Sequence, residues 1–290
     1  MRETTKLKKI LARREAVIVP GVANAMFARI VEAQGFEAVY VTGAGIANMH
    51  LGAPDVGLTT VTEVAEITAT IRDATTVPLI VDMDTGFGNA VNVVRTVRLL
   101  ERAGASGLQL EDQVFPKKCG HFSGKEVIPA DEMVQKIRAA VDARVDGDLQ
   151  IIARTDARAI EGLDAALDRA SAYIEAGADA TFVEAPTDLD ELAAIPARLD
   201  VPQFANMVHG GRTPDPGQKR LAEMGFSVAL YANAVLQATI RAANDTLAEL
   251  KSEGSLATLG DRLAGFEERQ ATVDKDAWDA LEERYRKRGE

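Results

Sequence analysis

Cysteine is almost absent from this 290-residue chain, and histidine is scarce. The single cysteine, Cys119, excludes a disulfide framework within the chain and favours a cytoplasmic setting over a secreted one. The three histidines, His50, His121 and His209, are too scattered for a typical zinc site. The N-terminus has no apolar run, so we expect no signal peptide, and no window reaches the roughly 18 apolar residues that a membrane span requires.

Positive charge is also in short supply. The chain has 33 Lys and Arg against 44 Asp and Glu, which gives a formal net charge of −11. Such an acidic chain repels phosphate backbones and anionic lipids, so we expect neither nucleic acid nor a membrane surface as a partner. A small anionic substrate is compatible with this charge if a local cation or a metal ion attracts it.

Common nucleotide and nucleophile motifs are missing as well. Segment 42–48 contains G-x-G after an expected strand, but Asn48 stands where the dinucleotide fingerprint has its third glycine. The chain has no G-x-x-x-x-G-K-[ST] loop and no G-x-S-x-G elbow. These absences argue against a nicotinamide enzyme, a P-loop enzyme and an α/β-hydrolase.

Short apolar runs alternate along the chain with longer amphipathic segments. Most of the short runs lack in/out alternation, which is typical of strands buried on both faces. We expect eight strands, at residues 16–20, 37–43, 78–84, 107–112, 150–156, 180–186, 202–207 and 227–233. Helical patterns lie between them, as over 61–74, 91–103, 130–144, 163–176 and 235–253.

This alternation indicates a parallel α/β fold, which is either a closed barrel or a doubly wound sheet. The even spacing of the units, and polar residues at the carboxyl ends of many strands, favour a (β/α)8 TIM barrel. The length fits such a barrel of about 250 residues plus an extension. We therefore expect one barrel domain over residues 1–290, in which 255–290 form a charged helical extension that packs on the barrel or contacts another subunit.

Acidic residues close two neighbouring strands of the expected barrel. Asp82 and Asp84 end the third strand and should point to the same side, because residues two apart on a strand do so. Glu111 ends the next strand and would approach the pair. Carboxylates this close must be protonated, pair with cations or hold a metal. Oxygen donors suit Mg²⁺ or Mn²⁺, while helix capping or pairing with Lys and Arg stays open as the alternative.

Further polar residues end the fifth, sixth and seventh strands. Arg154 is able to grip a substrate carboxylate with two parallel hydrogen bonds, or to form a structural ion pair with Asp156. Glu184 and Asn206 are pocket residues or helix caps. The residues alone leave both interpretations open.

The single cysteine lies in the most informative segment, at 111–125. This segment is polar, contains glycine and follows the fourth strand, where the active-site loops of barrels lie. A lone cysteine is usually a small buried hydrophobe, but Lys117, Lys118 and His121 make a poor core setting for Cys119. Nearby cations lower the pKa of a thiol, so Cys119 is a candidate general acid or nucleophile.

Together these residues resemble the isocitrate lyase/phosphoenolpyruvate mutase superfamily over nearly the whole chain. The resemblance rests on Asp-x-Asp-x-Gly-x-Gly at 82–88, Glu-Asp-Gln at 111–113, Lys-Lys-Cys-Gly-His at 117–121, Ala-Arg-Thr-Asp at 153–156 and Glu-Ala at 184–185. The segment at 117–121 is highly specific and marks the lyase branch, whose members cleave a carbon–carbon bond. Within that branch, the chain is most similar to the lyases of 2,3-dimethylmalate and 2-methylisocitrate.

The resemblance implies where a metal ion and the substrate bind. Asp82, Asp84 and Glu111 match the acids that hold Mg²⁺, partly through water. The segment Thr42, Gly43 and Ala44 matches the loop that binds the carboxylate of the 2-oxo acid, where the superfamily often has serine in place of threonine.

The same resemblance implies the catalytic groups. Arg154 matches an arginine that grips substrate, and Cys119 matches the general acid on a mobile gating loop. His121, which we count with these two as catalytic, matches a residue that binds the second portion of the substrate, as do Glu184 and Asn206. The base that removes the hydroxyl proton stays open between a metal-held water and a residue such as Tyr40.

The implied function is Mg²⁺-dependent retro-aldol cleavage of a substituted malate, such as 2,3-dimethylmalate, to a 2-oxo acid such as pyruvate and a carboxylic acid. The resemblance also implies a homo-oligomer, usually a tetramer, whose eighth helix is exchanged between subunits. The alternatives are 2-methylisocitrate cleavage, oxaloacetate decarboxylation or hydrolysis, and phosphonopyruvate chemistry on the same scaffold. A barrel that binds without catalysis is a further alternative, which the intact set of acids and the cysteine disfavour.

One segment departs from the superfamily pattern. His209 stands where many relatives have glutamate, and Val208 replaces a threonine common in methylisocitrate lyases. The missing hydroxyl favours a substituted malate smaller than methylisocitrate.

Overall fold

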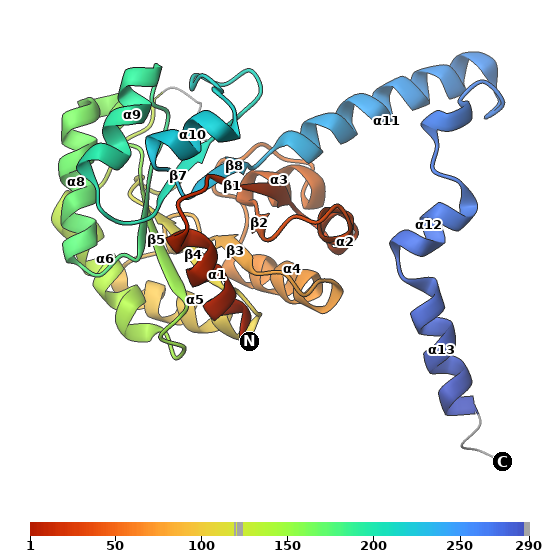
Figure 1. The fold of residues 1–290 in the computed structure, drawn as a ribbon, viewed down its shortest axis with the longest axis horizontal. Coiled ribbons are helices and arrows are strands. Elements are labelled where there is room, and N and C mark those ends of the chain that lie inside the picture. The colour runs from red at the N-terminus through yellow and green to blue at the C-terminus, as the bar shows by residue number, and fades with distance from the viewer. Residues whose placement is uncertain (119, 121–123, 287–290) are drawn as a thin grey trace. The chain divides into compact units, whose positions relative to one another are not determined.

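A computed structural model of the protein describes residues 1–118, 120 and 124–286. Eight parallel strands, paired in chain order, close into a barrel (Figure 1). The strands are β1 Val17–Val22, β2 Val39–Val41, β3 Leu79–Asp82, β4 Gly107–Glu111, β5 Gln150–Thr155, β6 Ala180–Val183, β7 Gln203–Asn206 and β8 Val228–Tyr231. This confirms the predicted (β/α)8 barrel, and all eight strands lie within the expected segments or overlap them.

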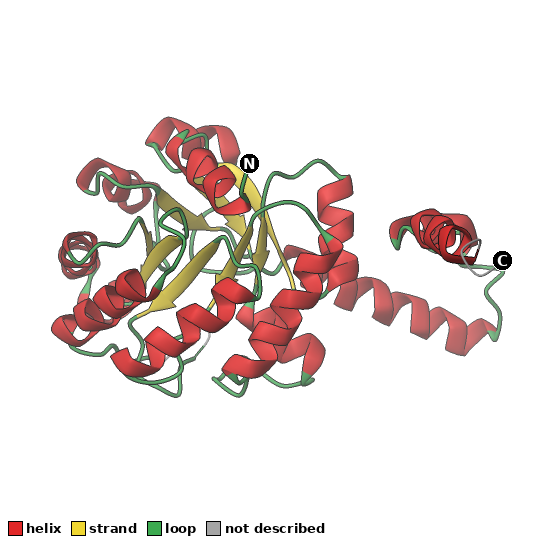
Figure 2. Ribbon diagram, turned by 90° about the horizontal axis from the view of Figure 1, so that it is seen from below, coloured by secondary structure: helices red, strands yellow, loops and turns green. Residues whose placement is uncertain are grey.

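Helices surround the barrel on its outer side (Figure 2). In chain order, the α-helices up to residue 253 are α1 Glu3–Ala12, α2 Ala25–Ala33, α3 Gly43–His50, α4 Val61–Ala74, α5 Ala90–Arg102, α6 Ala130–Ala143, α7 Arg158–Glu161, α8 Leu163–Glu175, α9 Leu189–Arg198, α10 Gln218–Met224 and α11 Ala234–Glu253. The extra C-terminal helices are also present, as η1 Gly260–Arg262, α12 Phe266–Thr272 and α13 Lys275–Arg286. None of the helices described is both long enough and apolar enough to span a membrane.

The interior of the barrel is packed from its amino-terminal end. Leu7 and Leu11 of α1 belong to the same buried cluster as Ile80, Phe182 and Phe204 of the strands. Burial of both strand faces explains the unbroken apolar runs in the sequence. Because side chains fill this end, room for a ligand is left at the carboxyl ends of the strands.

The chain divides into two compact units, Met1–Val235 and Leu236–Glu290. The first contains the whole barrel, and the second contains most of α11 and the helices that follow it. Exposed apolar side chains on the second unit include Leu256, Phe266, Trp278 and Tyr285.

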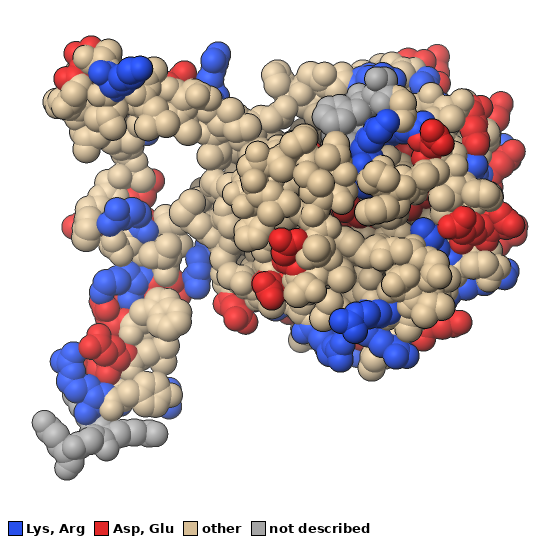
Figure 3. Space-filling model, turned by 180° about the vertical axis from the view of Figure 1, so that it is seen from behind, with Lys and Arg blue, Asp and Glu red and all other residues tan. Residues whose placement is uncertain are grey.

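On the barrel face shown in Figure 3, charged side chains gather mainly toward the edge, and its middle is largely uncharged. The acidic excess of the chain therefore does not form one continuous patch on this face.

Candidate active site

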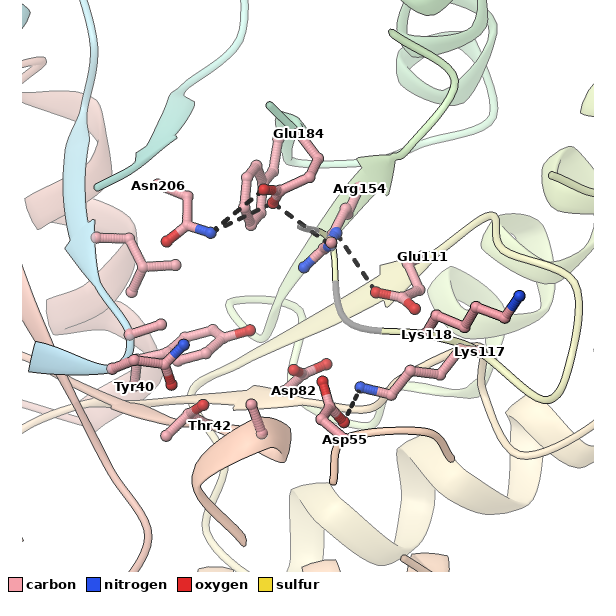
Figure 4. Close-up of a pocket in the computed structure, with 16 residues that line it drawn as sticks. Tyr40, Thr42, Asp55, Asp82, Glu111, Lys117, Lys118, Arg154, Glu184 and Asn206 are labelled. Carbon is pink, nitrogen blue, oxygen red and sulfur yellow. Dashed lines mark hydrogen bonds and ion pairs between the residues drawn. The ribbon is translucent and has the colours of Figure 1, made fainter. Parts of the chain in front are cut away.

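The carboxyl ends of the strands enclose a cavity of about 430 Å³, its mouth included (Figure 4). Polar and charged groups from seven of the eight strands and their following loops reach it. The described residues that line it are Tyr40, Thr42, Ala44, Asp55, Asp82, Glu111, Lys117, Lys118, Gly120, Arg154, Phe182, Glu184, Asn206, Leu230, Ala232 and Asn233.

Asp82 and Asp84 come together at one wall of this cavity. An alanine Cβ at position 43 would lie 3.0 Å from Asp82 Oδ2 and 3.2 Å from Asp84 Oδ1, so both carboxylates face the backbone of Gly43. The expected reason for this proximity was wrong. Strand β3 ends at Asp82, and Asp84 adopts a left-handed conformation with φ +47°. A turn, fixed in part by the Asp84 N–H donating to Asp82 Oδ1 at 3.1 Å, brings the two acids together.

A lysine occupies the space between these acids and a third one that the sequence did not single out. Lys117 Nζ lies 2.9 Å from Asp84 Oδ1 and 2.5 Å from Asp55 Oδ1, and the second of these contacts is drawn in Figure 4. Burial lowers the pKa of Lys117, but the surrounding acids, Asp84 first, outweigh it and raise that pKa well above its usual value. Burial raises the pKa of Asp84 to about 6, against the opposing effect of Lys117.

Glu111 and Arg154 pair across strands β4 and β5. Their closest atoms, Arg154 Nε and Glu111 Oε2, are 3.4 Å apart, and Arg154 Nη2 lies 3.4 Å from Glu184 Oε2. The ion pair to Asp156 that the sequence left open is also present, with Arg154 Nε 2.9 Å from Asp156 Oδ2. Burial raises the pKa of Glu111 well above its usual range, although Arg154 opposes this.

The N-terminus of α3 opens onto the same cavity. Thr42 is the N-cap residue, and its Oγ1 accepts a hydrogen bond from the N–H of Gly45 at 3.3 Å. Gly43 and Ala44 follow as the first residues of the helix, and the side chain of Ala44 lines the cavity. The unpaired N–H groups and the dipole of a helix N-terminus attract a carboxylate.

Several buried oxygens in the cavity have no hydrogen-bond partner among the residues that the structure describes. They are Glu111 Oε1, Asn206 Oδ1 and Asn233 Oδ1. Asn206 donates through Nδ2 to Glu184 Oε2 at 3.3 Å, so its amide is oriented (Figure 4). Because buried polar groups are normally satisfied, such oxygens indicate space for a ligand with donor groups or for a metal ion. Sequence reasoning missed Asn233, which lies two residues beyond the end of β8.

Tyr40 is present in the cavity, but its surroundings oppose a role as base. Its hydroxyl donates to Gln109 Oε1 at 2.7 Å. Burial raises the pKa of Tyr40 well above its usual value, and Asp82 acts in the same direction. The phenol therefore remains protonated and serves as a hydrogen-bond donor.

Cys119 and His121 lie outside the described residues, whereas Lys117, Lys118 and Gly120 are described. The two lysines expected to act on the thiol have other partners: Lys117 pairs with acids, and Lys118 Nζ donates to the carbonyl of Gly124 at 2.6 Å. Gly120 lies against the site, since an alanine Cβ there would be 2.5 Å from Arg154 Nη2. Val208 and His209, which we expected to shape specificity, are not among the residues that line the cavity.

The donor set suits a hard divalent cation. Within residues 1–118, 120 and 124–286, no three His, Cys, Asp or Glu side chains form a group that could hold a metal ion. Mg²⁺ does not require such a group, because it usually keeps several waters and binds to one or two carboxylates plus the substrate. Asp82, Asp84 and the unpartnered Oε1 of Glu111 are buried oxygen donors of the required kind.

Barrel enzymes place their chemistry at the carboxyl ends of the strands, and the cavity described above puts this chain in that class. The polar groups of this cavity are of the kinds that bind small anionic molecules. The chain belongs to the phosphoenolpyruvate phosphomutase family, whose sequence model matches residues 7–251. This confirms the resemblance to the isocitrate lyase/phosphoenolpyruvate mutase superfamily.

Two relatives are similar over almost their full length. The 2,3-dimethylmalate lyase of Eubacterium barkeri is 46% identical over 268 residues, which cover 92% of this chain and 93% of that protein. The 2-methylisocitrate lyase of Aeropyrum pernix is 42% identical over 287 residues, covering 95% of this chain and 92% of the relative. Both are named as lyases, in agreement with the expected enzyme class.

Solved structures are also similar to this chain over nearly its whole length. A crystal structure of 2,3-dimethylmalate lyase superimposes with a TM-score of 0.92 at 31% identity, covering 98% of this chain and 96% of that one. A phosphonopyruvate hydrolase, solved in complex with oxalate and Mg²⁺, superimposes with a TM-score of 0.89 at 28% identity, covering 98% and 99%.

Proposed function

We propose that this protein is a Mg²⁺-dependent carbon–carbon lyase that cleaves a substituted malate of the 2,3-dimethylmalate type to pyruvate and a carboxylic acid. The observation that carries the proposal is the grouping, in one cavity, of buried acids, an arginine and a helix N-terminus. Acids alone would repel a dicarboxylate, whereas this grouping offers anion-binding groups beside donors for a cation. The 2,3-dimethylmalate lyase relative supports the choice of substrate.

The acids would hold the metal ion. Asp82 and Asp84 lie close enough to share one cation, and Glu111 would contribute through its free oxygen or through water. When bound, Mg²⁺ would polarise the hydroxyl oxygen of the substrate and stabilise the charge of the forming 2-oxo acid. Lys117 would have to leave the Asp84 oxygen that it contacts, or share it.

The remaining residues would bind and orient the substrate. The N–H groups at Gly43 and Ala44 suit the carboxylate next to the hydroxyl carbon. Arg154 would grip a carboxylate and steady the negative charge that develops during bond breaking. Asn206, already oriented by Glu184, would bind the portion of substrate that leaves.

Cleavage breaks the bond between the hydroxyl-bearing carbon and the carbon next to the second carboxylate. The hydroxyl proton goes to a base, the pair of electrons of the broken bond goes to the leaving fragment, and Cys119 protonates that fragment. For 2,3-dimethylmalate, the products are pyruvate and propanoate. Tyr40 is a donor in the described geometry, which leaves a water as the base.

The proposal is tested by replacing Cys119 with serine and by removing the metal ion. We expect both changes to abolish most pyruvate release from 2,3-dimethylmalate, while the folded state, measured by circular dichroism, persists. Near-normal turnover of the Cys119→Ser variant would remove the cysteine from the mechanism. Full activity in excess chelator would reject the metal assignment.

We also propose a homo-oligomer in which the C-terminal helices contact another subunit, with the eighth helix exchanged in a tetramer. Exposed Phe266, Trp278 and Tyr285 support this, because large apolar side chains that gather on a surface mark interaction sites. Light scattering of the full chain and of a triple variant with these three residues replaced by serine would test it. A monomeric wild-type chain would contradict it.

A further inference from the structure

Lys125 is buried beside the candidate active site although it belongs to a loop. Its side chain is only 3% exposed, and the carboxylate that faces it, Asp156, is fully buried. Lys125 Nζ donates to Asp156 Oδ1 at 2.5 Å and to the carbonyl of Gly120 at 2.6 Å. A buried ammonium group is costly unless it is paired and hydrogen-bonded, so this position demands both partners.

Asp156, the first partner of Lys125, also pairs with Arg154 of the site. Asp156 Oδ2 accepts a hydrogen bond from Arg154 Nε at 2.9 Å, and its Oδ1 accepts one from Arg154 Nη2 at 3.2 Å. Burial alone would raise the pKa of Asp156, but Arg154 and Lys125 outweigh it and lower that pKa to about 2. The carboxylate is therefore charged, and it is shared by two cations.

Asp156 is itself fixed to the barrel wall. Its backbone N–H donates to Asp112 Oδ1 at 2.9 Å. Asp112 also accepts hydrogen bonds from the hydroxyl groups of Thr155, at 2.7 Å, and Tyr173, at 2.8 Å. Lys125 is thus anchored to a rigid network rather than to a mobile surface group.

Gly120, whose carbonyl is the second partner of Lys125, lies against Arg154. An alanine Cβ at Gly120 would be 2.5 Å from Arg154 Nη2 and 2.9 Å from Glu184 Cδ, so the backbone there touches both side chains. Gly120 directly follows Cys119 in the chain. By holding the Gly120 carbonyl and Asp156 together, the Lys125 ammonium fixes the loop backbone relative to Arg154.

We propose that Lys125 is a positioning residue of this site, which sets Arg154 through Asp156 and sets the backbone beside Cys119 through the Gly120 carbonyl. The proposal rests on the proposed function, since positioning matters for catalysis only if Arg154 and Cys119 act on substrate. Lys125 itself contacts no substrate. Its effect is to hold two separate groups in one geometry.

The test compares Lys125→Met with Lys125→Arg and, as a control away from the site, Lys8→Met. Lys8 also forms an ion pair, 2.9 Å to Asp148, but at the surface next to the amino-terminal end of β5 and away from the cavity. Three quantities are measured: kcat and KM for 2,3-dimethylmalate, the affinity for oxalate with Mg²⁺ by calorimetry, and the midpoint of thermal unfolding. Lys125→Gln replaces the methionine variant if that variant does not fold.

We expect Lys125→Met to lower kcat about 100-fold, the scale of a misplaced catalytic group, and to weaken oxalate binding about tenfold. Lys125→Arg keeps the charge and two donors, so it should recover most of the wild-type kcat and most of the oxalate affinity. Lys8→Met should change neither kcat nor oxalate affinity. A Lys125→Met chain that keeps normal kcat and oxalate affinity while its unfolding midpoint falls would show a merely structural role and overturn the proposal.

The proposed function and the positioning role of Lys125 are contradicted by different results. If the wild-type chain releases no pyruvate from 2,3-dimethylmalate, the proposed function is wrong, and oxalate affinity alone then decides the role of Lys125. If the wild type is active and Lys125→Met is equally active, only the positioning proposal is wrong.

Discussion

The Lys117 ammonium nitrogen lies 2.9 Å from a carboxylate oxygen of Asp84, inside the group of acids proposed to bind a divalent cation. An ammonium group on an oxygen donor occupies space that a metal ion would need at that donor, and the two positive charges repel each other. The ion pair therefore makes Lys117 a competitor of the metal ion in the chain without substrate.

Replacing Lys117 with methionine should strengthen Mg²⁺ binding in the absence of substrate. Removal of the competing charge should lower the Kd for Mg²⁺ about tenfold, or about 1.4 kcal/mol. Calorimetric titration of the variant and the wild type measures this, with Lys8→Met as the control. Weaker Mg²⁺ binding by Lys117→Met would mean that the lysine supports the metal site rather than competing with it.

Replacing Gly120 with alanine should impair catalysis without unfolding the protein. The added Cβ would meet Arg154 Nη2 at 2.5 Å, so the arginine or the loop backbone must shift. We expect kcat/KM to fall about 100-fold, as for other small misplacements in active sites. Gly147→Ala is the matched control, because a Cβ there meets nothing within 4 Å. Equal activity of the two variants would refute the close contact.

Removing the hydroxyl of Thr42 should affect both stability and substrate binding. Thr42→Ala removes the N-cap of α3 and should lower the free energy of unfolding by about 1 kcal/mol. It should also raise KM, because the start of that helix would fray. Thr42→Ser keeps the capping oxygen and should behave like the wild type in urea unfolding and in the assay. A serine variant as weak as the alanine variant would exclude capping as the role of this side chain.

Asp148 should give a pH-dependent contribution to stability far from the cavity. Hydrogen bonds from Thr5 and Lys8 lower its pKa to about 2, below the roughly 3.9 of an unfolded chain. A lowered carboxyl pKa stabilises the fold above pH 4, and this contribution is lost as the pH falls toward 2. The difference in unfolding midpoint between the wild type and Asp148→Asn should therefore be smaller at pH 3 than at pH 6. A larger difference in unfolding midpoint at pH 3 than at pH 6 would contradict the lowered pKa of Asp148.

The sequence predicts the barrel and its acidic site well because both depend on local patterns. Unbroken apolar runs mark strands buried on both faces, and polar residues at their ends mark the functional side of a barrel. Asp82, Glu111 and Arg154 were found in this way, and all three line the cavity.

Other features depend on contacts between distant segments, which no local pattern records. Asp55 lies in an irregular segment after α3, and its pairing with Lys117 exists only once the barrel has closed.

The turn after β3 is a local feature that the expected strand alternation did not describe. Asp84 reaches Asp82 through a left-handed turn rather than by strand alternation. The available signal for that turn was Gly86, two residues after Asp84 and just beyond the apolar run.

The central claim is that this cavity cleaves a substituted malate with the help of a divalent cation. The most direct measurement is proton NMR of 2,3-dimethylmalate incubated with the purified chain, with Mg²⁺ and with excess chelator. We predict equal amounts of pyruvate and propanoate with Mg²⁺ and neither product with chelator. An unchanged substrate in the presence of Mg²⁺, or the same products at the same rate in chelator, would contradict the account.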